Sequence, residues 1–216
     1  SVTKKWIKQI SVEKAPLFSE YKRASYFHHV ASIVLDTRKV RSKKQTDETD
    51  DDIGGEETVV KFLPQIPKEE FEKKVEWIYI FTMNGRIVKI GGTRDGLKGR
   101  SSSYLCGIHV VENGKSGKAS VTNSYIYNTF EFYLKLGCPI EMYGYELPLV
   151  KLPPIKILDR ENVVISAQTY PAYETIFMED FNQTYGFQPI LCNNCDSKYK
   201  EVVTRKSKEP LLKNVL

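Results

Sequence analysis

The sequence predicts an α/β (α+β) fold, with a small central antiparallel sheet flanked by helices. Two runs of β-forming residues, 76–82 and 86–90, flank the dipeptide Asn84-Gly85, whose residues both tolerate the positive φ angles of a type I′ hairpin turn. Two later segments, 124–136 and 171–185, are typical of helices, and a glycine follows each of them. The predicted order is strand, strand, helix, helix, strand, helix.

The first 45 residues are strongly basic. They contain eleven Lys and Arg residues against Glu13, Glu20 and Asp36, which is the charge balance of a surface that meets phosphates. The segment 46–57 (TDETDDDIGGEE) then has the composition of a solvated loop and separates this basic arm from the core. After it, KEEFEKKV at 68–75 predicts a short charged helix.

Glycines delimit the elements that follow the hairpin. The pair Gly91-Gly92 and Asp95 are expected to end the second strand and to start a helix that extends to Tyr104. The loop 107–123 contains NGKSGKAS, whose small and basic residues suit a close approach to phosphates, although an ordinary surface loop has the same composition.

The remaining elements follow from periodicity and from prolines. Apolar residues fall on one helical face over 124–136, Gly137 stops that helix, and 140–147 alternates like a strand. A proline-rich stretch and a β-like run at 155–166 form an insertion. Pro171 opens the last helix.

The composition is that of one main domain. With 216 residues, 41 % of them hydrophobic, the chain can bury one good core. Its apolar runs fall short of the roughly 18 to 20 residues of a membrane span, so we expect no membrane association and a cytoplasmic protein of a bacterium, or a viral protein inside a host cell. Cys192 and Cys195 form a single C-x-x-C pair, which is half a zinc site; unpaired thiols are the favoured interpretation and metal binding is the alternative.

One stretch of the chain matches a known pattern. The run 78–104, IYIFTMNGRIVKIGGTRDGLKGRSSSY, resembles the signature of the GIY-YIG nuclease superfamily. Ile78-Tyr79 matches the first motif, Lys89-Ile90-Gly91 matches the second, and Arg100 stands where the family has its helical arginine. Glu174 lies in the final helix, where the resemblance implies the metal-binding glutamate.

The motifs depart from the family pattern at two positions. Trp77 replaces the first glycine, and Lys89 replaces the tyrosine of the second motif. A lysine there is similar to one branch of type II restriction endonucleases. It also resembles phage and viral relatives whose motif ends in K-I-G-x-T, as it does here up to Thr93.

The resemblance implies a catalytic centre of Tyr79, Lys89, Arg100, Tyr104 and Glu174. Glu174 would bind a single Mg²⁺ or Mn²⁺ ion, because such ions prefer hard oxygen ligands. The Arg100 guanidinium suits the nonbridging phosphate oxygens, where charge builds in the transition state. Either Tyr79 or Lys89 is the candidate general base, and Tyr104 either hydrogen-bonds the reacting groups or packs in the core.

The expected function is that of a site-specific endonuclease, a type II restriction enzyme, that binds double-stranded DNA as a homodimer. The alternative is a noncatalytic or structure-specific nucleic-acid-binding protein of phage or viral type. The residues expected to contact DNA are Lys98, Ser102, Lys115, Ser116, Lys118, Asn123 and Asn128. Asn193 is expected to support the active site, with Asn194 as the competing assignment.

These assignments divide the chain into three parts. Residues 1–74 form the N-terminal basic arm with its acidic linker and short helix, 75–196 form the GIY-YIG core with insertions, and 197–216 form a C-terminal tail.

Overall fold

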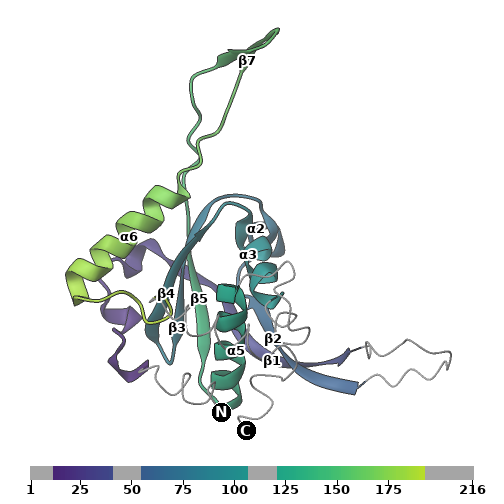
Figure 1. Cartoon of the computed structure of the whole chain (residues 1–216), viewed down its shortest axis with the longest axis vertical. Coiled ribbons are helices and arrows are strands. Elements are labelled where there is room, and N and C mark those ends of the chain that lie inside the picture. Colours follow the sequence, from purple (N-terminus) through teal and green to yellow (C-terminus); the bar gives the residue numbers. More distant parts are fainter. Residues whose placement is uncertain (1–11, 41–54, 107–120, 193–216) are drawn as a thin grey trace, which may run out of the picture.

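A five-stranded antiparallel sheet organises the protein, in the strand order β2-β1-β5-β3-β4. The computed structural model describes residues 12–40, 55–106 and 121–192 (Figure 1). Its elements are η1 (Val12–Lys14), η2 (Phe18–Glu20), η3 (Ala24–Tyr26), β1 (His28–Val40), β2 (Gly55–Pro64), α2 (Lys68–Glu72), β3 (Trp77–Met83), β4 (Arg86–Thr93), α3 (Gly96–Leu105), α5 (Val121–Lys135), β5 (Ile140–Glu146), β6 (Ile155–Ile157), β7 (Arg160–Val163) and α6 (Tyr170–Tyr185). The predicted mixed α/β fold, a central antiparallel sheet flanked by helices, is confirmed.

The hairpin of β3 and β4 is the one that Asn84-Gly85 predicts. Both residues have positive φ, 52° and 74°, as a tight hairpin turn requires. The last helix also ends as predicted, because Gly186 adopts the left-handed conformation (φ 78°) that closes α6.

Strand β4 continues to Thr93, so the expectation that the glycine pair ends this strand is wrong. Gly91 lies opposite Tyr79 in β3, and Gly92 lies opposite Ile78. These glycines therefore remain in the ladder, at the edge of the sheet.

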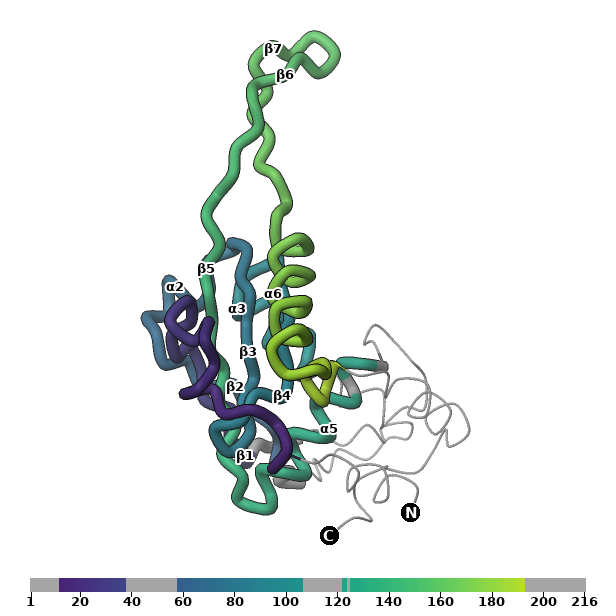
Figure 2. Tube along the Cα trace, turned by 90° about the vertical axis from the view of Figure 1, so that its left-hand side faces the viewer, coloured from purple at the N-terminus to yellow at the C-terminus, as the bar shows by residue number. Residues whose placement is uncertain are grey.

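The helices cover the two faces of the sheet (Figure 2). Trp77, Tyr79 and Phe81 of β3 pack in the core beneath α3 and α5. Ile78 and Ile80 point to the opposite face and pack against α6. Because side chains alternate along a strand, β3 serves both cores and every one of its residues is buried.

Strand β1 joins the N-terminal region to the sheet. It pairs with β2 along ten residue pairs and with β5 on its other side. Val30, Ala31 and Ile33 of β1 are buried in the core. The sequence patterns do not predict β1 or β2, because the charges around these short apolar runs dominate the hydrophobic pattern. Strands from both sides of the boundary expected at residue 74 thus share one sheet.

A long hairpin projects from the end of the body where β5 and α6 meet (Figures 1 and 2). It spans residues 148–168, which we call the arm, and contains β6 and β7. The β-like run expected at 155–166 is therefore not one strand: it contains both β6 and β7 and the turn between them. Among the described residues, no helix is both long enough and apolar enough to cross a membrane.

Candidate active site

Two buried tyrosines and an arginine form a hydrogen-bonded cluster beneath α3. The Tyr79 and Tyr104 hydroxyl oxygens lie 2.7 Å apart. Arg100 Nε donates to Tyr79 Oη at 2.8 Å and Arg100 Nη2 donates to Tyr104 Oη at 2.9 Å. The guanidinium carbon also lies 4.3 Å from the centre of the Tyr104 ring. Because α3 brings Arg100 and Tyr104 to one face, four residues apart, a single turn of helix supplies both partners of Tyr79.

The cluster has hydrogen-bond donors that the described residues do not use. The two hydroxyls share one hydrogen bond, so one of their two hydrogens has no acceptor among the described residues. A guanidinium has five N–H groups, and the two tyrosines take two of those of Arg100. The cluster can therefore donate to an oxyanion or a water that reaches it.

The Tyr79 hydroxyl is held in its protonated form. Burial raises the pKa of Tyr79 far above its usual value, and the nearby Tyr104 raises it further. The positive charges of Arg100 and Lys89 lower the pKa but do not offset the burial. Burial likewise raises the pKa of Tyr104. As it stands in the fold, the Tyr79 hydroxyl can donate or accept a hydrogen bond, but it is a poor base.

Lys89 lies on the same face of the sheet as Tyr79. It pairs with Phe81 across the β3–β4 ladder, and its side chain is buried against the segment that follows α6. Its Nζ lies 3.9 Å from Cys192 Sγ, and that thiol donates to the Ile90 carbonyl at 3.4 Å. The second motif therefore contributes a positive charge close to the tyrosine pair.

Glu174 approaches the same edge strand from the other face. Its Oε2 would lie 2.7 Å from a Cβ added at Gly92, and no described residue gives its carboxylate a hydrogen bond or an ion pair. A Cβ added at Gly91 would collide with the Tyr79 hydroxyl. Two consecutive glycines of β4 thus separate Glu174 from the tyrosine–arginine cluster, and neither could bear a side chain without displacing one of the two groups.

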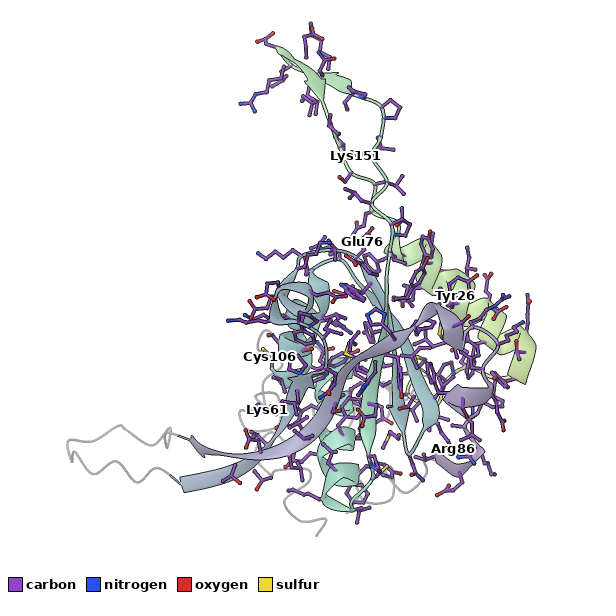
Figure 3. The ribbon with its side chains drawn as sticks, turned by 180° about the vertical axis from the view of Figure 1, so that it is seen from behind. Tyr26, Lys61, Glu76, Arg86, Cys106 and Lys151 are labelled. Carbon is purple, nitrogen blue, oxygen red and sulfur yellow. The ribbon has the colours of Figure 1, made fainter. Side chains whose placement is uncertain are left out.

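Glu76 fixes the start of the helix that carries Glu174. Its carboxylate accepts hydrogen bonds from Thr169 N, Thr169 Oγ1 and Tyr170 N at 3.1 to 3.2 Å. Figure 3 shows Glu76 where the arm leaves the body. A carboxylate at this position satisfies free N–H groups and faces the positive end of the helix dipole. No local sequence pattern marks Glu76 as a capping residue, because its partner Thr169 lies 93 positions away.

We expect Glu76→Gln to lower the free energy of unfolding by about 1 to 2 kcal/mol, because the neutral amide loses the charge at the helix start. Urea unfolding of the purified chain measures this change. Glu72→Gln is the matched control, since its carboxylate pairs with exposed Lys98, and it should cost much less stability than Glu76→Gln. Equal losses in the two variants would contradict the capping role.

The residues expected to contact DNA fall into three groups. Lys98 and Ser102 are exposed on α3, and Lys98 pairs with Glu72 at 2.7 Å. Asn123 and Asn128 lie on α5 and are only 9 % and 4 % exposed, so burial counts against base contacts by either amide in this conformation. The others, Lys115, Ser116, Lys118 and Asn193, lie outside the described residues, as does the alternative Asn194.

The donor set for a metal ion is small. The described residues contain no group of three or more His, Cys, Asp or Glu side chains that could hold one. Cys192 is a free thiol whose hydrogen bond goes to a backbone carbonyl, while Cys195 lies outside the described residues. Glu174 has the right chemistry for Mg²⁺, a carboxylate without a protein partner among the described residues, and it would leave most of the coordination sphere to water and substrate.

Comparisons with known proteins give distant structural likenesses. No protein-family model matches the chain, and no curated protein does. One similar solved structure is the restriction endonuclease HPY188I in complex with product DNA, at a TM-score of 0.48 and 19 % identity, covering 85 % of this chain and 89 % of that chain. A bacteriophage T4 EndoII mutant is similar at a TM-score of 0.43 and 19 % identity, covering 77 % and 95 % of the two chains. Both are too distant to assign a function to this chain.

Proposed function

We propose that the chain is a metal-dependent endonuclease of the GIY-YIG type that hydrolyses double-stranded DNA. The observation that carries this proposal is the placement of complementary groups around one edge strand. The Tyr79–Arg100–Tyr104 cluster meets β4 at Gly91 on one face, and the Glu174 carboxylate meets the next glycine on the other. Phosphodiester hydrolysis needs a metal ligand, hydrogen-bond donors and a fixed positive charge, and these residues supply all three.

Glu174 is the residue that would hold the divalent ion, Mg²⁺ or Mn²⁺. Such an ion, when bound, supplies charge stabilisation at the scissile phosphate and a lower pKa for a water. A single carboxylate agrees with a one-metal scheme. Glu76 keeps this carboxylate in register with β4 by capping α6 one turn earlier.

Arg100 binds the scissile phosphate in this proposal. Two of its five N–H groups are held by Tyr79 and Tyr104, which leaves three for the nonbridging oxygens. The two bonds to buried hydroxyls fix the guanidinium before substrate arrives, so little order has to be created on binding. A fixed donor is most effective where negative charge grows in the transition state.

Tyr79 orients the attacking water as a hydrogen-bond donor or acceptor, without taking its proton as a phenolate. The raised pKa of its hydroxyl is the reason for this assignment. Lys89 contributes its positive charge beside this hydroxyl, and Tyr104 holds both Tyr79 and Arg100 in place.

Site-specific cleavage in the manner of a type II restriction enzyme is the finer proposal, together with a homodimer that presents one site to each strand. Incubating the purified chain with a supercoiled plasmid and Mg²⁺ tests it. We expect discrete linear fragments, and none when EDTA replaces the metal. A smear would contradict site specificity, and intact plasmid under all divalent metals would contradict the nuclease itself.

We expect the two glycines of β4 to respond differently to alanine. Gly91→Ala pushes the buried Tyr79 ring and should lower the free energy of unfolding by about 1 to 3 kcal/mol. Gly92→Ala meets the Cδ2 atom of the Tyr170 ring and the end of the Glu174 side chain, and both residues are only half-buried, so they can move more easily than the buried Tyr79. It should therefore cost less stability while it lowers the cleavage rate about tenfold or more, because the metal ligand is displaced. Urea unfolding and plasmid cleavage measure the two effects, and a fully active Gly92→Ala would contradict this placement of Glu174.

A further inference from the structure

The arm (148–168) exposes far more apolar surface than the rest of the described structure. Eight of the thirteen exposed large hydrophobic side chains among the described residues lie on it. They include Leu149 at 69 %, Leu158 at 87 % and Val164 at 56 % exposure. At roughly 100 Å² for a large aliphatic side chain, this amounts to roughly 400 Å², the size of the largest apolar patch on a typical monomer, and such patches often mark interaction sites. Figure 3 shows the arm, with Lys151 labelled, projecting away from the body, so the body does not cover these side chains.

An isolated ribbon of this kind needs a partner to be stable. The arm consists of two strands, which pair with each other through Leu152 N to Ile165 O at 2.8 Å and Ala167 N to Val150 O at 2.7 Å. Two-stranded hairpins are at best marginally stable in water, and three or more strands with an apolar face are needed for a stable sheet. The arm therefore has both an apolar surface and unpaired edges to satisfy.

The two edges of the arm are not equivalent. The arm's two hydrogen bonds lie on either side of the Lys151–Ser166 bridge, so these two residues form a non-hydrogen-bonded pair. Their N–H and C=O groups therefore point outward, away from the partner strand. By the two-residue period, Pro153 faces outward on the first strand and Val164 on the second. Pro153 has no N–H, so the first edge cannot accept a further strand there. The second edge, 160–167, contains no proline. Asn162 has a left-handed φ of 55°, so the part of this edge that is free to pair is 163–167.

We infer that the open edge of the arm pairs with the same edge of a second copy of this chain, in antiparallel orientation. Antiparallel pairing of two identical edges is two-fold symmetric, so it closes at two copies and forms one four-stranded sheet from two arms. The proline-blocked edges then lie outermost, where they prevent further addition. The exposed apolar side chains of the arm supply roughly half of the ~800 Å² that each partner buries in a standard interface, and the paired backbone adds to this area.

The charges of the arm favour a second copy over nucleic acid. Lys151, Lys156 and Arg160 are opposed by Asp159 and Glu161. Lys156 Nζ and Glu161 Oε1 already pair at 2.7 Å within the arm. A nearly neutral, apolar ribbon lacks the several free cations that a DNA groove requires, but it meets an identical ribbon without net repulsion.

This pairing extends the proposed nuclease function. Only the cleavage measurement below rests on that function, and the sedimentation measurement does not. The arm leads directly into α6, the helix of Glu174. Two arms joined edge to edge would connect two α6 helices, and so two candidate sites, in one assembly.

Sedimentation of the full chain at micromolar concentration tests the pairing without any assumption about activity. We expect a dimer for the wild type, and for Val164→Pro a monomer or at least a tenfold weaker dimer, because proline removes the outward N–H. Lys151→Pro is the matched control, since it places proline at an outward position of the edge that Pro153 already blocks, and it should remain a dimer. A monomeric wild type overturns the inference, as do two proline variants that behave alike.

A shortened arm gives a second test. Replacing 153–164 by Asn-Gly joins Leu152 to Ile165, a hydrogen-bonded pair of the arm, through a two-residue turn, and we expect a monomer with unchanged unfolding of the body. If the proposed function holds, this variant should nick plasmid but produce at least tenfold less linear product than the wild type. Absence of cutting by either protein would refute the nuclease and leave the sedimentation result standing. The inference is overturned if the shortened variant is still a dimer. It is also overturned if the wild type is a monomer and shortening the arm abolishes its binding to DNA.

Discussion

Glu174→Gln should lower the rate of DNA cleavage by about a thousandfold while the protein stays folded. The amide keeps the size of the side chain but removes the negative charge that would hold the metal ion. Loss of metal assistance costs several kcal/mol of transition-state stabilisation, and about 4 kcal/mol corresponds to this change in rate. The carboxylate makes no hydrogen bond or ion pair with the described residues, so its replacement removes no interaction that stabilises the fold among them.

Glu179→Gln is the matched control for this variant. Glu179 is exposed on the same helix, so the substitution makes the same change of charge in α6 away from the two glycines. Single-turnover cleavage at a series of Mg²⁺ concentrations, together with thermal unfolding, measures both variants. Cleavage by Glu174→Gln at the control rate would refute the metal site, and with it the form of nuclease proposed here.

Much of the candidate site could be predicted because its signals are local. The turn at Asn84-Gly85 sets the register that brings Gly91 opposite Tyr79. Helix spacing then places Arg100 and Tyr104 on one side of α3, where both reach the Tyr79 hydroxyl. Each of these relationships depends on residues within about one supersecondary unit, which is the range over which sequence patterns have physical meaning.

The remaining features depend on contacts between distant segments. The hydrogen bonds from α6 to Glu76 need the chain to return after more than ninety residues, and no local pattern encodes that return. Strands β1 and β2 could not be predicted, because the charged residues around them mask the apolar pattern, although Val30 and Ile33 are buried in the core. The burial of Asn128 was equally inaccessible, because residues 125–130 of α5 are all buried, whichever side of the helix they lie on. Tertiary packing overrode composition in each case.

The positions of Tyr79 and Glu174 on opposite faces of β4 also could not be read from motifs. Resemblance to a nuclease signature names the residues but does not say what lies between them. In the structure, the glycine pair lies between them. Because glycine has no side chain, the Tyr79 hydroxyl can approach β4 on one face and the Glu174 carboxylate on the other. The second glycine of K-I-G-G-T is therefore part of the site's geometry, although the sequence analysis expected it only to end a strand.

Arg100→Lys should lower cleavage about a hundredfold to a thousandfold, which is the usual effect of removing one fixed donor from a transition state. A lysine keeps the positive charge, but its single ammonium group cannot reproduce the planar fork that bonds Tyr79 through Nε and Tyr104 through Nη2. The tyrosine pair would also lose the guanidinium that lies over the Tyr104 ring. The loss should therefore appear mainly in kcat, with DNA affinity nearly unchanged, because the charge that attracts the backbone remains.

Arg94→Lys provides the comparison, since Arg94 lies in the turn just before α3 and is exposed beside Asp95. It should cleave at the wild-type rate. Single-turnover cleavage and DNA binding, measured for both variants, separate a loss in kcat from a loss of affinity. If instead Arg100→Lys cleaves at the rate of this control, then Arg100 is a packing residue, and the phosphate must be bound by a cation elsewhere in the chain.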